Sequence, residues 1–268
     1  MKRAVLPILL LICCLPSQRI AGDPQVSTKS DTPVPGWVAY KTPTDDELRC
    51  ANYSIKREWR VALKGEQLDL SLVPQPQGKG QSHVIRVNDG WLTGEDAGEF
   101  GGGLWWTSFN RRHRKKLSDE NILGFVNSSK GVLAIGGLSH MGFESGVVLR
   151  VTGGPGLKRR AVELADLGWA PSAFVSESPD SVIVLTTGGI SRVKTSGAVE
   201  QLYRTRYNLL YPNSMTLSSS GVIHVGMRHF ITRLTPNEHT YTEEWFVPAD
   251  CTHFRKSSIE CVCINTRS

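Results

Sequence analysis

Carboxylate, amide and imidazole side chains recur in this chain in the loops next to apolar, strand-like segments. The candidate ligand-binding residues are Glu95, Asp96, Glu99, Asn121, His140, Glu144, Asn213, Arg228 and His229. Carboxylates and amides can hold Ca²⁺ or another divalent cation, and a carboxylate beside an imidazole can work as acid and base. Either chemistry requires that loops far apart in the sequence meet at one place.

Taken singly, these residues have structural explanations. The glycines at 101–103 are typical of a tight turn, and Asn213 follows a proline, where its side chain often caps a turn. A single histidine such as His140 is most often a hydrogen-bonded loop residue. Only convergence of the group on one face of the fold favours a ligand site.

A repeated unit predicts such convergence. A turn followed by an alternating apolar strand recurs at Asp89, Lys130, Asp180 and Ser220, with spacings of 41, 50 and 40 residues. The first strand of each unit is predicted at residues 84–87, 122–126, 173–176 and 214–217. The third strand is predicted at 104–108, 147–152, 190–195 and 230–235, and the fourth at 161–164, 199–203 and 242–247. Alternation with Gly, Ser, Thr and Val excludes helical repeats of similar period.

Four short strands at a period near 40 residues are typical of a β-propeller blade, which must stack on neighbouring blades to bury both faces. The sequence therefore predicts an all-β propeller over residues 37–250. A hairpin at residues 53–73, joined with residues 37–40, would supply a fifth blade. Five blades is our count, with six as the alternative.

The segment from Tyr211 to Gly226 resembles the blade core of gluconolactonase-like and NHL-type propellers, in which Pro-Asn precedes the innermost strand. The similarity covers residues 84–247. For a lactonase it implies a metal site, and Asn213 is the metal ligand that the motif carries over. The glutamate and the late aspartate of that site have no identifiable counterpart here.

Two basic runs are predicted at loops joining third and fourth strands, on the face opposite the candidate residues. They comprise Arg111, Arg112, Arg114, Lys115 and Lys116, and then Lys158, Arg159 and Arg160. Neighbouring blades would place the runs together as a basic rim for an anionic envelope polymer, although a solvated hairpin tip explains them equally simply. A basic residue also recurs within three third strands, as Arg150, Arg192 and Arg233.

The first residues read as an export signal. Lys2 and Arg3 precede an apolar stretch too short to span a bilayer, so we expect a signal peptide at 1–22 and a linker at 23–36. A lipid anchor on Cys13 or Cys14 is disfavoured, since no small residue precedes either. Residues 1–22 hold three basic residues and no acid, so their removal lowers the formal net charge from +6 to +3.

Four cysteines remain in the mature chain, and an even count in an exported protein favours disulfides. They are Cys50, Cys251, Cys261 and Cys263. We expect Cys50 and Cys251 each to pair with one of the last two, or with each other. The tail at 251–268 would then clasp the first blade to the last.

These patterns favour a secreted or periplasmic propeller that binds a small molecule, a glycan or an envelope protein at its axial face, with no catalysis asserted. One alternative is a metal-dependent, lactonase-like hydrolase at the same opening. Another is an envelope scaffold that uses the basic rim. Nucleic acid is not an expected partner, and no further segment is long and apolar enough for a membrane span.

Overall fold

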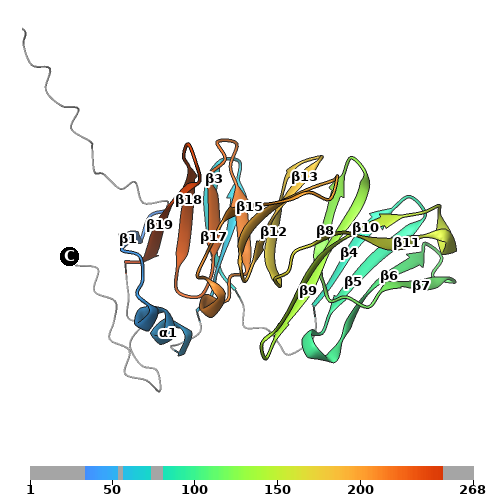
Figure 1. Ribbon diagram of the computed structural model, residues 1–268, viewed down its shortest axis with the longest axis horizontal. Helices are drawn as coiled ribbons and strands as arrows, with labels where there is room; N and C mark the ends of the chain where they lie inside the picture. The colour runs from blue at the N-terminus through green and yellow to red at the C-terminus, as the bar shows by residue number, and fades with distance from the viewer. Residues whose placement is uncertain (1–33, 54–56, 74–80, 250–268) are drawn as a thin grey trace, which may run out of the picture. The chain divides into compact units, whose positions relative to one another are not determined.

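A computed structural model (Figure 1) describes residues 34–53, 57–73 and 81–249. The predicted signal peptide, most of the linker and the C-terminal tail lie outside these residues. So do Cys251, Cys261 and Cys263, while Cys50 lies in a helix, so the disulfide pairing stays a prediction. No helix within the described residues is long and apolar enough to cross a membrane.

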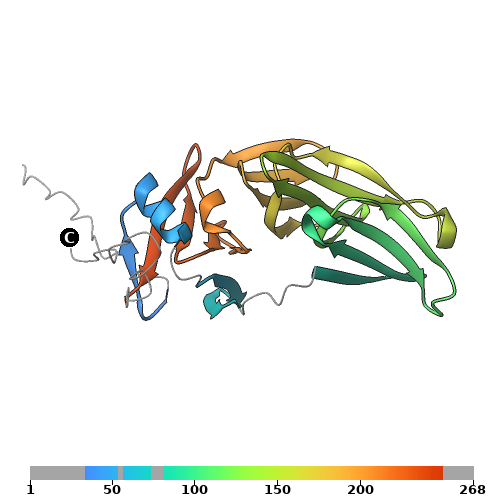
Figure 2. The same cartoon turned by 90° about the horizontal axis from the view of Figure 1, so that it is seen from below.

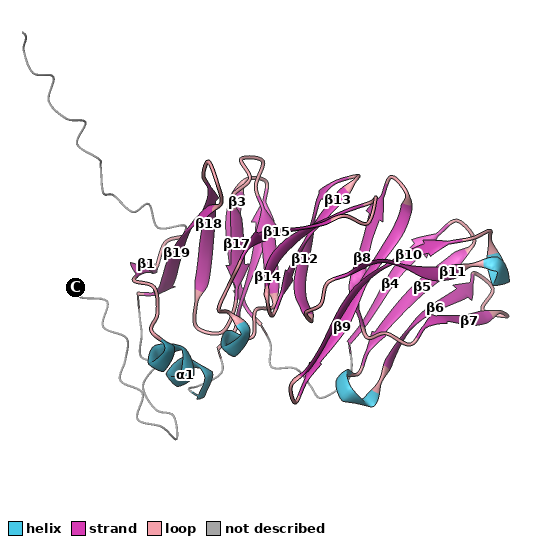
Figure 3. Cartoon of the chain, in the orientation of Figure 1, coloured by secondary structure: helices cyan, strands magenta, loops and turns pink. Residues whose placement is uncertain are grey.

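The regular secondary structure of the described chain is mostly antiparallel sheet (Figure 3), which confirms the predicted all-β class. Three sheets of four strands are simple meanders, as in propeller blades. They consist of β4 (Gln81–Val87), β5 (Gly90–Asp96), β6 (Gly102–Ser108) and β7 (Arg114–Ser118), then β8 (Ile122–Ser128), β9 (Gly131–His140), β10 (Phe143–Thr152) and β11 (Arg160–Asp166), then β12 (Pro171–Ser178), β13 (Ser181–Thr186), β14 (Gly189–Lys194) and β15 (Val199–Tyr203).

The last sheet has five strands, because the N-terminal β1 (Trp37–Tyr40) pairs antiparallel with β19. Its other strands are β16 (Ser214–Leu217), β17 (Ile223–Gly226), β18 (Ile231–Pro236) and β19 (Tyr241–Pro248). The predicted grouping of residues 37–40 with the hairpin at 53–73 is therefore wrong. The hairpin forms a separate two-stranded sheet of β2 (Trp59–Lys64) and β3 (Gln67–Leu72). β19 otherwise has a free edge, which β1 covers.

Neighbouring sheets share hydrophobic cores because their central strands are apolar on both faces. In β13, Val182 and Val184 pack with Leu133 and Ile135 of β9, whereas Ile183 and Leu185 pack toward the β16–β19 sheet. Leu92 and Ile122 belong to the core between the first two meanders, and Val61 and Phe246 to the core between β2–β3 and the last sheet. Four hydrophobic cores thus link the five sheets. The number of propeller blades that these sheets form stays a prediction.

The repeated basic residue of the third strands ties strands together. Arg192 of β14 forms ion pairs with Glu177 of β12, two strands away, and with Glu200 of the adjacent β15, and Arg233 of β18 pairs with Glu244 at 2.8 Å. Arg150 of β10 donates to the carbonyl oxygen of Thr195 in the next sheet. These positions are structural.

A helix, α1 (Asp45–Tyr53), lies against the last sheet (Figure 2) and buries Leu48 and Ala51 in its core. Thr44 and Glu47 form a reciprocal capping box at its start: the Thr44 N–H donates to Glu47 Oε2 at 2.8 Å, and the Glu47 N–H donates to Thr44 Oγ1 at 3.3 Å. Three short 3₁₀ turns, η1 (Gly98–Phe100), η2 (Gly156–Lys158) and η3 (Asn208–Leu210), lie in loops.

Candidate functional site

The loop carrying η1 contacts the entry to the next innermost strand, as the repeat predicts. Asn121, just before β8, is buried; its Oδ1 accepts from the Ala97 N–H at 3.3 Å and its Nδ2 donates to the Gly98 carbonyl at 3.0 Å. Gly102 permits this approach, because a Cβ there would collide with the Asn121 side chain. Asn121 therefore fixes the loop, and its amide is already occupied.

Glu99 and His140 are brought together across two sheets. His140 Nε2 lies 2.7 Å from Glu99 Oε2, and both side chains are about half exposed. The neighbouring Glu95 accepts from Trp105 Nε1 at 3.0 Å and pairs with Arg114 at 2.9 Å, while Asp96 accepts from the Gly98 N–H at 2.9 Å. These acids hold the first meander and its loop in place rather than facing a common ligand.

Glu144 fastens β10 to the next sheet. Its carboxylate accepts from Ser139 Oγ at 2.7 Å, from the Ala170 N–H at 3.1 Å and from Thr187 Oγ1 at 2.8 Å. Burial raises the pKa of Glu144, but these hydrogen bonds outweigh burial, so the pKa lies below its ordinary value. The carboxylate oxygens of Glu144 thus already accept hydrogen bonds from groups of the protein itself.

Arg228 and His229 lie inside the fold, where both are buried. Arg228 donates to the Asn52 carbonyl at 2.8 Å and to Glu58 at 3.0 Å, and its guanidinium stacks on the Tyr211 ring. The His229 N–H donates to the Arg57 carbonyl at 2.9 Å. These two candidates join the β17–β18 loop to the segment before β2.

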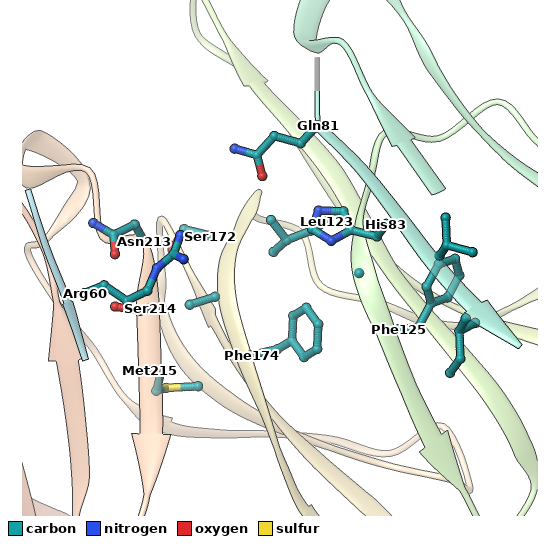
Figure 4. Close-up of a pocket in the computed structure, with 14 residues that line it drawn as sticks. Arg60, Gln81, His83, Leu123, Phe125, Ser172, Phe174, Asn213, Ser214 and Met215 are labelled. Carbon is teal, nitrogen blue, oxygen red and sulfur yellow. The ribbon is translucent and has the colours of Figure 1, made fainter. Parts of the chain in front are cut away.

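The structure reveals a cavity that the sequence reasoning did not place. Its volume is about 480 Å³, and each of the five sheets contributes its innermost strand to the lining (Figure 4). Polar lining residues are Arg60 of β2, Gln81 and His83 of β4, Ser172 of β12, Ser214 of β16 and Asn213 just before it. Phe125, Phe174 and Met215 supply most of the apolar surface. Of the predicted residues, only Asn213 lines this cavity.

Two polar side chains of the cavity have unsatisfied buried atoms. Neither Oδ1 nor Nδ2 of Asn213 has a hydrogen-bond partner in the described structure, and the same holds for His83 Nε2. In Figure 4, Asn213 lies on one side of the cavity with Arg60 and Ser214, and His83 lies on the other. A buried polar group without a partner costs free energy unless a ligand or water satisfies it. These atoms are themselves buried, so a ligand in the cavity would bond to them only after a rotation of the side chain.

The charge of the cavity favours an anion. Arg60 is its one charged lining residue among those described, and no Asp or Glu lines it. Nor do three His, Cys, Asp or Glu side chains gather to hold a metal ion anywhere in the described part of the chain. The arrangement around Asn213 thus differs from the acid-rich set that the lactonase resemblance implies.

Residues of the basic rim from two sheets lie together, as predicted, but several of them bond to other groups of the protein. Lys115 Nζ donates to the Leu157 and Arg159 carbonyls, both at 2.8 Å. Arg159 is buried and pairs with Asp89. Residues 114–116, predicted as loop, lie in β7, where Arg114 and Lys116 stack on the Trp105 ring.

Replacement of Asn213 by alanine and replacement of Asn121 by alanine should have different effects on stability. Asn213→Ala removes two unsatisfied buried atoms, so we expect the free energy of unfolding to stay constant or to rise by about 1 kcal/mol. Asn121→Ala strands the Ala97 N–H and the Gly98 carbonyl and should cost about 1–3 kcal/mol. Urea unfolding of the two variants measures both values; an equal loss would assign Asn213 a structural role.

No protein-family model and no curated protein matches the chain. Among solved structures, it is similar to a protein of unknown function from Bacteroides caccae, with 10% identity and a TM-score of 0.38 over 71% of this chain and 73% of that one. It is also similar to the extracellular domain of a hybrid two-component system from B. thetaiotaomicron (10% identity, TM-score 0.43, 69% of this chain and 26% of that one). Streptogramin B lyase gives 15% identity and a TM-score of 0.40 over 69% of this chain and 58% of its own. Likeness at this level assigns no function, so function is argued from the cavity.

Proposed function

We propose that this chain is an exported β-propeller that binds a small, anionic ligand in the central cavity. The observation that supports the proposal best is a cavity of about 480 Å³ that all five sheets line and in which Arg60 is the one charged residue among those described. Export is inferred from the N-terminal sequence alone.

The lining indicates the chemical class of the ligand. Arg60 offers a cation, Gln81 offers an amide, and Phe125 and Phe174 offer apolar ring surface. A volume of about 480 Å³ lies within the range of small-molecule sites. A compact carboxylate with a planar or apolar body matches each of these features, whereas a divalent cation would meet Arg60 without any carboxylate.

Binding without turnover is the function that these residues support. A lactonase-like mechanism would need acidic metal ligands or a general base at the cavity, and the described lining supplies neither. Among the described lining residues, His83 is the one imidazole and no carboxylate is present to orient it. We therefore assign no catalytic residue.

The test uses three small aromatic carboxylates, namely benzoate, 4-hydroxybenzoate and nicotinate, with benzyl alcohol as a neutral comparison. Saturation-transfer NMR should detect at least one carboxylate on the wild-type protein and should detect benzyl alcohol weakly or not at all. Arg60→Met should weaken binding by about tenfold or more, since it removes the positive charge that would pair with the carboxylate.

Arg112→Met is the matched control, because Arg112 is exposed, carries the same charge and lies outside the cavity. It should leave carboxylate binding within twofold of wild type. The proposal is wrong if none of the three carboxylates binds, or if Arg60→Met binds them as the wild type does.

A further inference from the structure

The β2–β3 sheet is narrower than every other sheet of the described chain. It has two strands, whereas the three meanders have four and the last sheet has five. Arg60 of β2 lines the central cavity, and the described lining includes no residue of β3, so the far side of β3 points away from the cavity. Neighbouring blades of a propeller stack through their faces. Such stacking leaves the outer edge of β3 uncovered.

The hydrogen-bond pattern shows which backbone groups this edge presents. The Val73 N–H donates to the Glu58 carbonyl at 2.8 Å, so these two residues form a hydrogen-bonded pair. Along an antiparallel ladder such pairs alternate with pairs that share no hydrogen bond. Val61 lies in a pair of the second kind, because its N–H turns away from β3 and donates to Ser214 Oγ at 2.9 Å. The β3 residues whose N–H and C=O groups point outward are therefore Leu68, Leu70 and Leu72.

The sequence of β3 does not protect this edge from pairing. Exposed edges are usually blunted by proline, lysine or a bulge, and β3 contains none of the three. Its one charged side chain, Asp69, is held by Lys64 at 3.1 Å. Leu72 is 50% exposed, at the end of a row that begins with the buried Leu68. A further strand would cover this leucine and satisfy the outward backbone groups.

The chain leaves the last sheet close to the β2–β3 hairpin. The Ala249 N–H donates to the Gly36 carbonyl at 2.8 Å, and the ring of the adjacent Trp37 meets that of Trp59 in β2 edge to face at 4.9 Å. Fully extended, residues 250–258 span about 30 Å, whereas the six residues of β3 span roughly 20 Å. The stretch that follows residue 258 is therefore within reach of the whole β3 edge.

Residues 259–264 have the composition of a strand. They read Ile-Glu-Cys-Val-Cys-Ile, and they lie between two serines and Asn265. β-Branched and apolar residues bounded by Ser and Asn are typical of strands. Cys50 lies in α1, which Arg228 joins to Glu58 at the start of β2. The predicted disulfide from Cys50 to the cysteines of this stretch would hold it near the hairpin.

The segment that follows β3 directly is a poorer candidate for the same edge. Pro74 and Pro76 have no N–H to donate to a ladder. The chain must also return to Gln81, which lines the cavity together with Arg60, near the end of β3. A strand running back along β3 from Val73 would lead away from that point.

We propose that residues 259–264 add to the outer edge of β3 as its third strand. The interaction surface is the row of outward N–H and C=O groups of β3, and its occupant is the C-terminal part of the same chain. Strand addition of this kind gains its strength from main-chain hydrogen bonds and its register from alternate side chains. The pairing does not involve Arg60, so this proposal and the proposed ligand fail separately.

The experiment follows hydrogen exchange of individual amides in the full chain by NMR. The amides of Leu68, Leu70 and Leu72 should exchange about 100-fold or more slowly than that of Gly65 in the exposed turn, after correction for intrinsic rates. Nuclear Overhauser contacts should join these leucines to residues 259–264. Unprotected amides would overturn the proposal. So would contacts to residues 74–80 instead, or protection that rises with protein concentration, which would make a second copy the occupant.

Two double proline variants form a matched pair. Ile259→Pro with Val262→Pro interrupts the proposed strand and should speed exchange of the three leucine amides by about tenfold or more. Thr252→Pro with Ser257→Pro places the same number of prolines before the stretch and should change it by no more than about twofold. Val184, buried in β13, should stay protected in both, which excludes general unfolding. Equal effects of the two double variants, or no effect of either, would contradict the proposal.

Discussion

Replacing Arg228 by methionine should lower the free energy of unfolding by about 3–5 kcal/mol, because it leaves a carboxylate without its buried partner. Arg228 is 4% exposed and bonds at once to α1 through Asn52, to Glu58 before β2 and to the ring of Tyr211. Thermal unfolding should shift downward by roughly 10 °C for a domain of this size. Urea unfolding gives the same loss in free energy.

Arg206→Met is the matched control. Arg206 also reaches the start of α1, through an ion pair with Asp45 at 3.0 Å, but both side chains are more than half exposed. An exposed pair contributes at most about 1 kcal/mol. If Arg228→Met costs no more than Arg206→Met, the junction among α1, β2 and the β17–β18 loop does not depend on this guanidinium. Adding Glu58→Gln to Arg228→Met should recover part of the loss.

Acid should destabilise the protein through His224. Burial, followed by the charge of Arg233, lowers the pKa of His224 from 6.5 to about 4. Above pH 6.5 the imidazole is neutral in both states, so it adds no pH dependence. Between pH 6.5 and 4 only the unfolded chain binds the proton, so stability falls as pH falls, by about 3 kcal/mol in total at about 1.4 kcal/mol per pKa unit. Below pH 4 this contribution levels off.

The measurement is urea unfolding at several pH values for wild type and His224→Gln. The variant lacks the titrating ring, so the difference between the two curves should change across pH 4–6.5 and stay constant above it. His113→Gln is the control, because His113 is exposed. Parallel curves for wild type and His224→Gln would contradict the assignment.

Much of the strand pattern was predictable because each repeat couples a turn to strict alternation. The turns at Asp89, Asp180 and Ser220 separate strands whose facing residues form the shared cores. Alternation is a local property of the chain, so one sequence suffices to detect it. The meeting of the η1 loop with Asn121 then follows from the order of strands.

The missed features depend on contacts between distant segments. β7 begins with Arg114-Lys115-Lys116, which reads as a polar loop until Trp105 is seen to cover the charged side chains. The helix α1 does have a local signal, the Thr44-x-x-Glu47 capping box, but a strand-based repeat gives no place for a helix. The sequence contains only a weak indication of the cavity, namely a polar residue near the start of successive strands, such as Ser172 and Asn213. The cavity forms only where strands from all five sheets come together, which a local pattern cannot show.

The pairing of β1 with β19 also bears on the order in which the chain folds. Trp37 is among the first described residues to leave the ribosome, yet its partner Pro248 follows about 200 residues later. Contacts of such high sequence separation form slowly, since loop-closure entropy is lost before the contact stabilises anything. The first strand therefore has no partner during nearly all of synthesis, so the edge of the last sheet is covered only when the chain is almost complete.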